Sequence, residues 1–162
     1  STGEEPYTLS IILNEIASNQ KDFLFNILAT DISHSCLSTG SRGVYTENQA
    51  EIIPLELRKK YLLRSRNSAE GLVQMGPVLR QCIQFKSLNL MDRRFSLAEK
   101  MDVIFCRNVM IYFNNQLREE LVARFEHQLI AGGYLFVGHS ESLNGIKNSL
   151  KQVAPMVYRK IQ

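Results

Sequence analysis

Apolar side chains recur every three or four residues near the start of the chain. The stripe consists of Leu9, Ile12, Leu13 and Ile16. This spacing places the four side chains on one face of a helix. Pro6 stands just before the stripe and suits a first helical turn, because the N–H that proline lacks would have no partner there. The pattern therefore predicts an amphipathic helix directly after the loop "STGEE".

Four short segments have the character of β-strands. Residues 25–32, 103–106 and 134–138 are apolar runs of the length expected for buried strands. Residues 156–161, near the end of the chain, also have strand character. The first of these runs ends in an acidic residue, Asp31, followed by Ile32.

Helical patterns separate these strands. One stripe consists of Leu117, Leu121, Val122, Phe125 and Leu129. We expect Gly132-Gly133 to end that helix, because glycine commonly follows the last helical turn. Residues 33–60 are mixed in composition, and we expect them to be partly helical with breaks at Gly40 and Gly43.

The segment 61–88 differs from the rest, because it consists of short and partly alternating runs. Its runs are residues 61–64, 71–75 and 78–85, with turn sequences at 67–71 and 76–77. Closely spaced short strands joined by turns are typical of an antiparallel sheet. We therefore expect a small antiparallel β insertion at about 61–88.

The alternation of strands and helices outside the insertion predicts an α/β fold with a mostly parallel sheet and helices on both faces. A chain of 162 residues is long enough to bury a core and fits one domain. We expect residues 1–162 to form that domain, with the β insertion inside it.

The composition excludes few functions, but it bears on the partners, the cell compartment and the metal sites that can be expected. The net charge of +3 does not by itself indicate nucleic acid or a membrane surface as a partner, and no run is long enough to span a bilayer. Cys36, Cys82 and Cys106 are odd in number and lack CxxC spacing, which favours free thiols and the cytoplasm. Only three scattered histidines are present, so no metal site is predicted.

Ligands of open parallel sheets bind beyond the carboxyl ends of the strands. Four segments should meet there: residues 1–5, Asp31, the region of Asn89, and residues 106–112. Gly3 lets the backbone approach a ligand closely. Asp31 could accept hydrogen bonds from ribose hydroxyls, although an acid after a strand is more often a helix cap.

The chemistry of the first loop favours a nucleoside without phosphates. The loop lacks the GxGxxG pattern that holds a pyrophosphate. Glu4 and Glu5 are adjacent carboxylates that would repel a phosphate and attract a cationic amine or sulfonium.

Several segments together resemble one enzyme family, the CheR-type glutamate methyltransferases of bacterial chemoreceptors. The matching segments, in order, are "STGEEPYTLS", "ATDIS", "SLNLMD", "MDVIFCRNVMIYF" and "GGYLFVGHSESL". The resemblance covers nearly the whole chain. It implies a Rossmann-like class I methyltransferase sheet, S-adenosylmethionine as cofactor with S-adenosylhomocysteine as product, and γ-glutamyl methyl esters on receptor side chains.

The resemblance also implies roles for particular residues. Glu5 and Asp31 correspond to cofactor ligands, with Asp31 on the ribose, and Asn89 and Leu90 correspond to the pair beside the adenine. The third set follows the strand at 103–106: Cys106 and Arg107 correspond to cofactor contacts, and Tyr112 to the tyrosine close to the reactive methyl group. We therefore expect Arg107 and Tyr112 to serve catalysis.

Methyl transfer to a carboxylate explains why no catalytic triad is visible. The carboxylate nucleophile is already ionised at neutral pH, so no strong general base is needed. Positioning and an electrostatically matched site should supply most of the rate enhancement. An arginine and a tyrosine hydroxyl can orient a carboxylate.

The same residues also have ordinary structural interpretations. Tyr112 could be a packed aromatic in an apolar stretch, and Arg107 a surface cation. Cys106 is more simply a small buried residue at a strand end than a nucleophile. His139 could line a pocket or make a structural hydrogen bond, and Asn89 could stabilise a turn.

Two further questions stay open in the sequence. In some members of the family the β insertion docks a C-terminal receptor peptide by adding a strand, whereas here it could be a flap without a partner. The family also carries an N-terminal helical domain, with an active-site arginine, and a strand before the glycine loop. We expect this chain to be the C-terminal methyltransferase domain of a longer polypeptide that includes them.

Other functions compatible with these residues are a methyltransferase with another acceptor and an inactive relative that binds receptor or cofactor.

Overall fold

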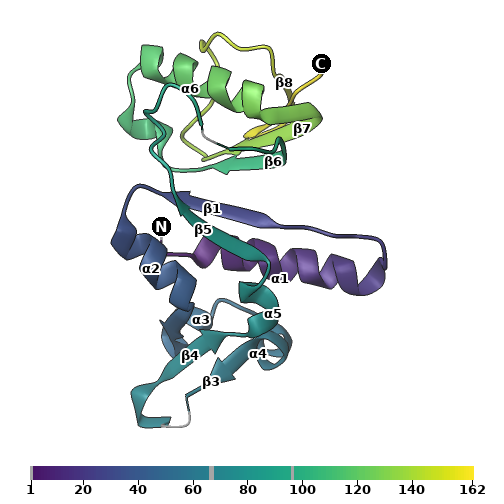
Figure 1. Ribbon diagram of the computed structural model, residues 1–162, viewed down its shortest axis with the longest axis vertical. Coiled ribbons are helices and arrows are strands. Elements are labelled where there is room, and N and C mark those ends of the chain that lie inside the picture. The colour runs from purple at the N-terminus through teal and green to yellow at the C-terminus, as the bar shows by residue number, and fades with distance from the viewer. Residues whose placement is uncertain (1, 66–67, 96) are drawn as a thin grey trace. The chain divides into compact units, whose positions relative to one another are not determined.

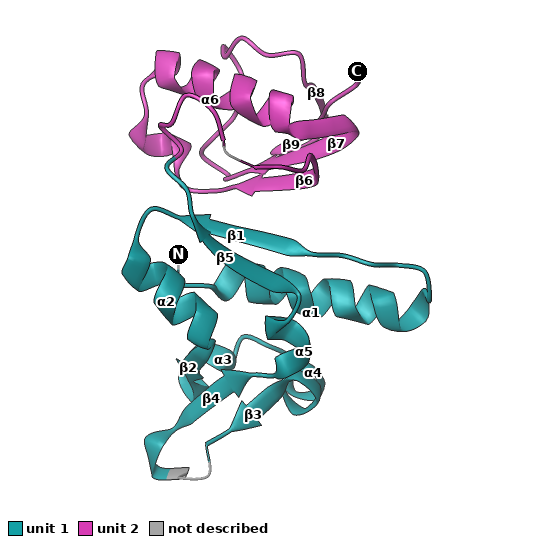
Figure 2. Ribbon diagram, in the orientation of Figure 1, with its two compact units in different colours: residues 1–89 teal, residues 90–162 magenta. Residues whose placement is uncertain are grey.

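The computed structural model describes residues 2–65, 68–95 and 97–162 (Figure 1). The chain divides into two units, residues 1–89 and 90–162, each with its own hydrophobic core (Figure 2).

Unit 1 is built around a parallel pair of strands. β1 (Ile27–Asp31) pairs with β5 (Ile83–Ser87), with Ile27 opposite Ile83 and Asp31 opposite Ser87. Both strands therefore end at the same edge. Helices α1 (Glu4–Asn19) and α2 (His34–Arg42) pack against this pair, and α5 (Pro77–Arg80) leads into β5.

Helix α1 confirms the helix predicted from the apolar stripe, but a different set of residues is buried. Tyr7, Ser10 and Ile11 are fully buried, whereas Ile12 is about half exposed at 51%. The buried Ser10 donates a hydrogen bond to the carbonyl of Leu79, which satisfies its hydroxyl. The buried residues precede those of the stripe by two positions, about 200° around a helix of 3.6 residues per turn, so the most deeply buried face of α1 lies nearly opposite the predicted stripe.

A three-stranded antiparallel sheet completes unit 1. Its order is β2 (Val44–Thr46), β4 (Leu72–Met75), β3 (Leu62–Arg64). Helices α3 (Glu47–Ala50) and α4 (Leu55–Tyr61) precede β3, and the short 3₁₀ turn η1 (Ser68–Glu70) lies between β3 and β4. The turn predicted at 67–71 begins outside the described residues.

The antiparallel insertion is confirmed, but one of its predicted strands is wrong. Residues 78–85 form the end of α5 and most of β5, and β5 pairs with β1 in parallel. The third strand is instead β2, which precedes the predicted segment. Pro77 starts α5 at the first helical position, where proline is favoured, so the alternation of residues 78–85 is interrupted by a helical turn.

Unit 2 contains the second parallel pair, β6 (Met101–Cys106) and β7 (Leu129–Val137). The strands β9 (Val157–Arg159) and β8 (Lys151–Ala154) extend this sheet on the far side of β7, both in antiparallel pairing. The 3₁₀ turn η2 (Met110–Tyr112) and the helix α6 (Asn115–Gln128) connect β6 to β7.

The expectation that Gly132-Gly133 end the helix is wrong. Helix α6 ends at Gln128, and β7 runs through both glycines. Their backbone groups bond to the C-terminal segment: Gly132 donates to the carbonyl of Lys160, and the amide of Lys160 donates to the carbonyl of Gly133. Hydrogen bonding to residues distant in the sequence therefore outweighs the local preference of glycine for a helix end.

Each core explains why its unit folds. In unit 2, Leu121, Val122 and Phe125 of α6 pack with Leu129 and Leu135 of β7. Leu121 and Leu135 are completely buried, and a fully buried leucine contributes about 1.5–3 kcal/mol to stability. The predicted α/β class, with parallel strands and an antiparallel insertion, is confirmed. Within the described residues no helix is both long and apolar enough to cross a bilayer.

Candidate functional site

The residues predicted to form the site are divided between the two units, at strand ends, at the start of α1 and in η2. Glu5, Asp31 and Asn89 belong to unit 1, and the other predicted residues belong to unit 2. The latter are Leu90, Cys106, Arg107 and Tyr112.

The first loop leads into α1 through Gly3. Gly3 is buried and has φ of 105°, a left-handed conformation that other residues rarely adopt. A Cβ at this position would stand 2.7 Å from the Tyr45 hydroxyl and 2.9 Å from Gly40 Cα. Protein atoms therefore already fill the space beside Gly3, and a close approach to a ligand is not needed to explain this glycine.

Two tyrosine hydroxyls fasten the same region. Tyr45 donates to the Thr2 carbonyl at 2.8 Å, and Tyr7 donates to the Gly40 carbonyl at 2.8 Å. Both rings are buried and meet edge to face, with centroids 6.1 Å apart. Burial raises the pKa of both phenols, and for Tyr45 the negative charge of Glu4 adds to the effect. Both phenols therefore stay protonated and donating over the whole physiological range.

Asp31 and the residues after β5 lie at one edge of the parallel pair. The Asp31 carbonyl accepts a hydrogen bond from the amide of Leu88, and Asn89 is the next residue. The Asp31 side chain is half-buried and accepts the amide of Ser33 at 2.8 Å through Oδ1. Ser33 itself caps α2, so the helix-cap interpretation of Asp31 is wrong. Glu5 is also half-buried, in the first turn of α1.

At the end of β6, three residues differ sharply in exposure. Cys106 is 5% exposed, which agrees with a buried residue at a strand end. Arg107 is exposed, and Tyr112 is 80% exposed at the end of η2. The interpretation of Tyr112 as a packed core aromatic is therefore wrong, and its phenol is available to a substrate or cofactor. Leu90 packs against the core of unit 2, and its carbonyl accepts a hydrogen bond from Arg124.

The most deeply buried acid among the described residues was not predicted from the sequence. Glu141 is 1% exposed and accepts hydrogen bonds from backbone amides that follow β6 and β7. Its partners are the amides of Asn108, Met110, Ile111 and Gly138. The motif "GHSES" drew attention to His139, which is exposed. The available signal was a glutamate three residues after the glycine that directly follows a buried strand.

The residue chemistry fits the predicted cofactor. Half-buried carboxylates, Glu5 and Asp31, suit the hydroxyl and ammonium groups of a sulfonium nucleoside, and carboxylates do not suit phosphate. An S-adenosylmethionine molecule would bring the electrophilic methyl group. Whether all the predicted residues line one cavity stays a prediction.

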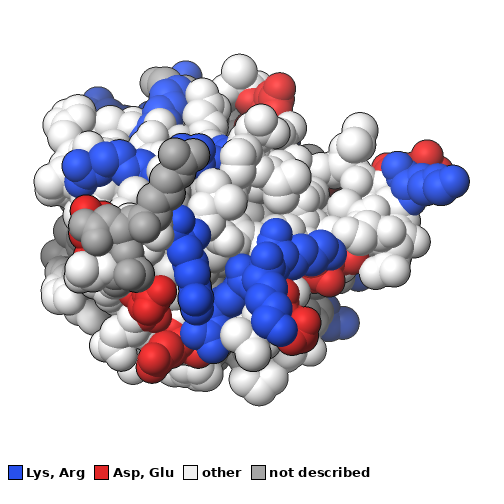
Figure 3. All heavy atoms as spheres, turned by 90° about the horizontal axis from the view of Figure 1, so that it is seen from below, with Lys and Arg blue, Asp and Glu red and all other residues white. Residues whose placement is uncertain are grey.

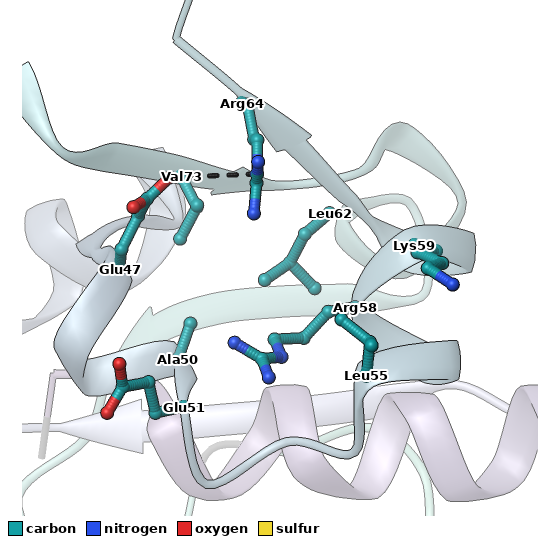
Figure 4. A pocket seen from close by; sticks show the side chains of 9 residues that line it. All are labelled: Glu47, Ala50, Glu51, Leu55, Arg58, Lys59, Leu62, Arg64 and Val73. Carbon is teal, nitrogen blue, oxygen red and sulfur yellow. Dashed lines mark ion pairs between the residues drawn. The ribbon is translucent and has the colours of Figure 1, made fainter. Parts of the chain in front are cut away.

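A separate hollow lies in unit 1 between α3, α4 and β3. It measures about 520 Å³. Arg58 points into it, and Arg64 lies at its rim, 3.6 Å from Glu47 (Figure 4). The last turn of α4 is basic, since it carries Arg58, Lys59 and Lys60. On the face shown in Figure 3, lysine and arginine side chains gather with acidic side chains next to them.

Comparison with known proteins gives one consistent result. Residues 1–158 match the family described as "CheR methyltransferase, SAM binding domain". The "Chemotaxis protein methyltransferase" of Borreliella burgdorferi is 42% identical over 161 residues, which are 99% of this chain and 56% of the relative. The "Chemotaxis protein methyltransferase 2" of Pseudomonas aeruginosa is 37% identical over 98% of the chain and 56% of the relative.

The "Chemotaxis protein methyltransferase" of Salmonella typhimurium is 32% identical, over 98% of this chain and 54% of the relative. The chain thus spans about half the length of the curated relatives that it matches.

Proposed function

This chain belongs to the CheR methyltransferase family, and we propose that the protein methylates glutamate side chains of bacterial chemotaxis receptors with S-adenosylmethionine. The match of residues 1–158 to the family's SAM-binding domain carries this proposal. The names of the similar proteins support chemotaxis as its setting. A receptor's cytoplasmic domain as substrate supports a cytoplasmic location, and the described residues contain no disulfide.

The reaction requires positioning more than acid–base catalysis. The acceptor carboxylate is ionised at neutral pH and attacks the methyl carbon as the bond from that carbon to sulfur breaks. No proton has to be removed from the nucleophile. The protein therefore has to align the carboxylate with the methyl group and to hold both in a matched electrostatic environment.

We assign roles to the predicted residues on this basis. Asp31 would accept hydrogen bonds from the ribose hydroxyls, and Glu5 would face the positively charged end of the cofactor. Asn89 and Leu90 would contact the adenine. These assignments rest on the position of each residue at a strand end or helix start.

In unit 2, Cys106 would contact the cofactor at the end of β6. Arg107 and Tyr112 would orient the acceptor carboxylate. Their exposure supports this, because both side chains can be reached by a receptor segment. The guanidinium offers paired donors to a carboxylate, and the phenol offers one more.

A labelled-methyl assay tests the function directly. The full-length protein is incubated with radiolabelled S-adenosylmethionine and a receptor cytoplasmic fragment, with the same fragment carrying alanine at its acceptor glutamates as control. We expect base-labile label on the first fragment alone. Equal label on both fragments would indicate another acceptor, and no label with no heat of S-adenosylhomocysteine binding would indicate an inactive scaffold.

A tyrosine variant tests the proposed catalytic role. Tyr112→Phe should lower kcat at least tenfold while changing the Kd for S-adenosylhomocysteine less than threefold, on the order expected for a lost charge-orienting hydrogen bond. Tyr134→Phe, on β7, is the matched control and should change neither quantity. Equal losses of kcat and affinity in Tyr112→Phe would contradict a role at the methyl group.

We also propose that the antiparallel sheet docks the C-terminal peptide of a receptor. β3 is an edge strand of this sheet, and an extended peptide could add to it as a further strand. The adjoining hollow, with Arg58 and Arg64, could take the terminal carboxylate (Figure 4).

Charge reversal tests the docking. Arg64 is 77% exposed, so Arg64→Glu should leave the fold intact while weakening binding of a fluorescent C-terminal receptor peptide at least tenfold. Arg42→Glu, which changes an exposed arginine just before the opposite edge strand β2, is the control. Equal weakening by both variants would reduce the effect to general electrostatics, and no binding by the unmodified protein would exclude peptide tethering.

A further inference from the structure

Glu141 is a buried anion whose ligands are backbone amides. Oε1 accepts the amide of Met110 at 2.6 Å and that of Ile111 at 3.3 Å. Oε2 accepts the amide of Asn108 at 2.7 Å and that of Gly138 at 2.7 Å. Each oxygen therefore takes two donors, and at least three of these bonds have the short lengths typical of charged acceptors.

Besides Glu141, the segment is held by two backbone bonds of the 3₁₀ turn, from the amides of Tyr112 and Phe113, and by Arg118, whose Nε donates to the Met110 carbonyl; none of these bonds takes up the amides that Glu141 binds. Residues 108–111 form the turn into η2, a 3₁₀ turn of only three residues. Asn108 has φ of 59°, in the left-handed region that costs energy for a residue other than glycine. Met110 is 1% exposed, so without Glu141 its amide would lose this acceptor in a place that water does not reach.

The segment that carries Glu141, by contrast, is held by hydrogen bonds to the end of β7 and to Tyr158. The amide of Glu141 donates to the carbonyl of Gly138 at 2.9 Å, which closes a turn at the end of β7. Two residues later, the buried Leu143 donates its amide to the hydroxyl of Tyr158, which is 3% exposed. The carboxylate is thus fixed by the sheet of unit 2, and it in turn fixes residues 108–111.

We propose that Glu141 is a positioning residue that sets the backbone between Arg107 and Tyr112, and through it the placement of both side chains. Arg107 directly precedes the first amide that Glu141 binds, and Tyr112 directly follows the last. This inference rests on the proposed function, because it gives these two side chains their significance. A buried glutamate serves here because one carboxylate can accept all four amides, whereas a neutral side chain of the same size cannot.

Glu141→Gln in the full-length protein is the first test. The variant is nearly isosteric, but its NH₂ group would face two backbone amides that also donate. Hydrogen exchange should accelerate about 10- to 100-fold at the amides of residues 108, 110, 111 and 138, as expected for lost charged hydrogen bonds. We expect kcat for receptor methylation to fall by a similar factor at a temperature far below unfolding.

Two controls separate positioning from general destabilisation. Glu126→Gln changes a glutamate that accepts a single backbone amide, that of Ser149, and should leave kcat unchanged. Leu121→Ala removes a fully buried side chain of the same core and should lower the melting temperature without changing kcat in the folded enzyme. Loss of kcat in Leu121→Ala equal to that in Glu141→Gln would overturn the proposal.

Gly138→Ala provides a second route to the same effect with Glu141 in place. A Cβ at Gly138 would stand 2.4 Å from Oε2 of Glu141 and 3.1 Å from the amide nitrogen of Asn108. The carboxylate must then withdraw, so Gly138→Ala should reproduce the exchange and kcat phenotypes. The double variant should be no worse than the more severe single variant. Independent, additive losses would contradict a shared mechanism.

The outcomes also distinguish this inference from the proposed function. Accelerated exchange at the four amides without any loss of receptor methylation would overturn the positioning role and leave the proposed function intact. If the unmodified protein neither methylates receptors nor binds S-adenosylhomocysteine, the proposed function fails. The positioning role then fails with it, even where the exchange data confirm that Glu141 holds the loop.

Discussion

The loop at Gly3 and the loop at residues 108–111 both contain left-handed residues, yet they are held by opposite chemistry. At Gly3, two buried phenols donate hydrogen bonds to backbone carbonyls. At residues 108–111, one buried carboxylate accepts hydrogen bonds from backbone amides. Neutral donors spread over two aromatic rings hold the first loop, whereas one anion holds the second.

Because of this difference, we expect the two loops to be destabilised by different kinds of substitution. Packing of Tyr7 and Tyr45 makes the first loop sensitive to added volume, because the ring positions leave no space beside Gly3. The second loop is sensitive to the charge and geometry of Glu141. A small change in volume should therefore harm the first loop most, and an isosteric change in charge should harm the second loop most.

The largest effect is expected from Gly3→Ala. The new Cβ would contact both Tyr45 and Gly40, and alanine is strained at φ of 105°. The free energy of unfolding should fall by about 3 kcal/mol. Gly71→Ala is the matched control, because Gly71 also has a positive φ but no atom within 4 Å of its Cβ position, and it should cost about 1 kcal/mol. Urea denaturation of the full-length protein measures both, and equal costs would remove the packing argument.

The next largest effect is a loss of stability in alkaline solution. The folded pKa of Tyr7 and of Tyr45 is raised by burial above the usual value near 10. Their contribution is therefore complete below about pH 10 and declines as the pH rises from there towards the folded pKa, by up to about 1.4 kcal/mol per pH unit for each phenol.

Denaturation of the wild type and of the Tyr7→Phe, Tyr45→Phe double variant between about pH 9 and 11 measures this term. The double variant should be less stable at neutral pH and should lose less stability over this range. Parallel pH profiles for the two proteins would show that neither phenol is responsible.

A smaller effect is expected at Asn108. Asn108→Ala should cost about 1 kcal/mol because alanine tolerates φ of 59° less well than asparagine. Asn108→Gly should cost nothing or stabilise slightly, since glycine adopts this conformation freely. Thermal unfolding of the two variants gives the comparison. A loss in Asn108→Gly as large as that in Asn108→Ala would point to the asparagine side chain instead of the backbone.

The smallest effect is expected at the far end of α1. Hydrogen bonds from Lys60 and then Tyr61 lower the pKa of Glu15. The resulting stability is present above the unfolded pKa of Glu15 and is lost as the pH falls through the folded pKa. The pair is partly exposed, at 49% for Lys60 and 41% for Glu15, so screening keeps the effect small.

Acid denaturation of Glu15→Gln against the wild type measures this last term, with Glu56→Gln as control. Glu56 forms an exposed ion pair with Lys59 on α4. Wild type should be more stable than Glu15→Gln near neutral pH, and the two should converge in acid. A constant difference at all pH values would exclude a role for the Glu15 charge.

The elements that local patterns specify were predicted well from the sequence. The helix after Pro6, the strands that end in Asp31 and Cys106, and the helix containing Leu121 all form near their predicted positions. Local periodicity is enough to give the type and position of an element, and in α6 it also gives the buried face, whereas in α1 Ile12 and Ile16 of the stripe stay exposed. The motifs of the sequence also indicated the CheR methyltransferase family, and the match over residues 1–158 confirms it.

What only the tertiary structure decided are features that depend on partners distant in the chain. The local sequence predicted that Gly132-Gly133 end a helix, but hydrogen bonds to Lys160 place them in β7. The alternation of residues 78–85 predicted a strand of the insertion, but the strand β5 that includes residues 83–85 pairs with β1. No role was predicted for Glu141, because nothing local shows that amides 30 to 33 residues earlier converge on its carboxylate. A sequence states which groups are available to bond, and the fold alone determines which of them meet.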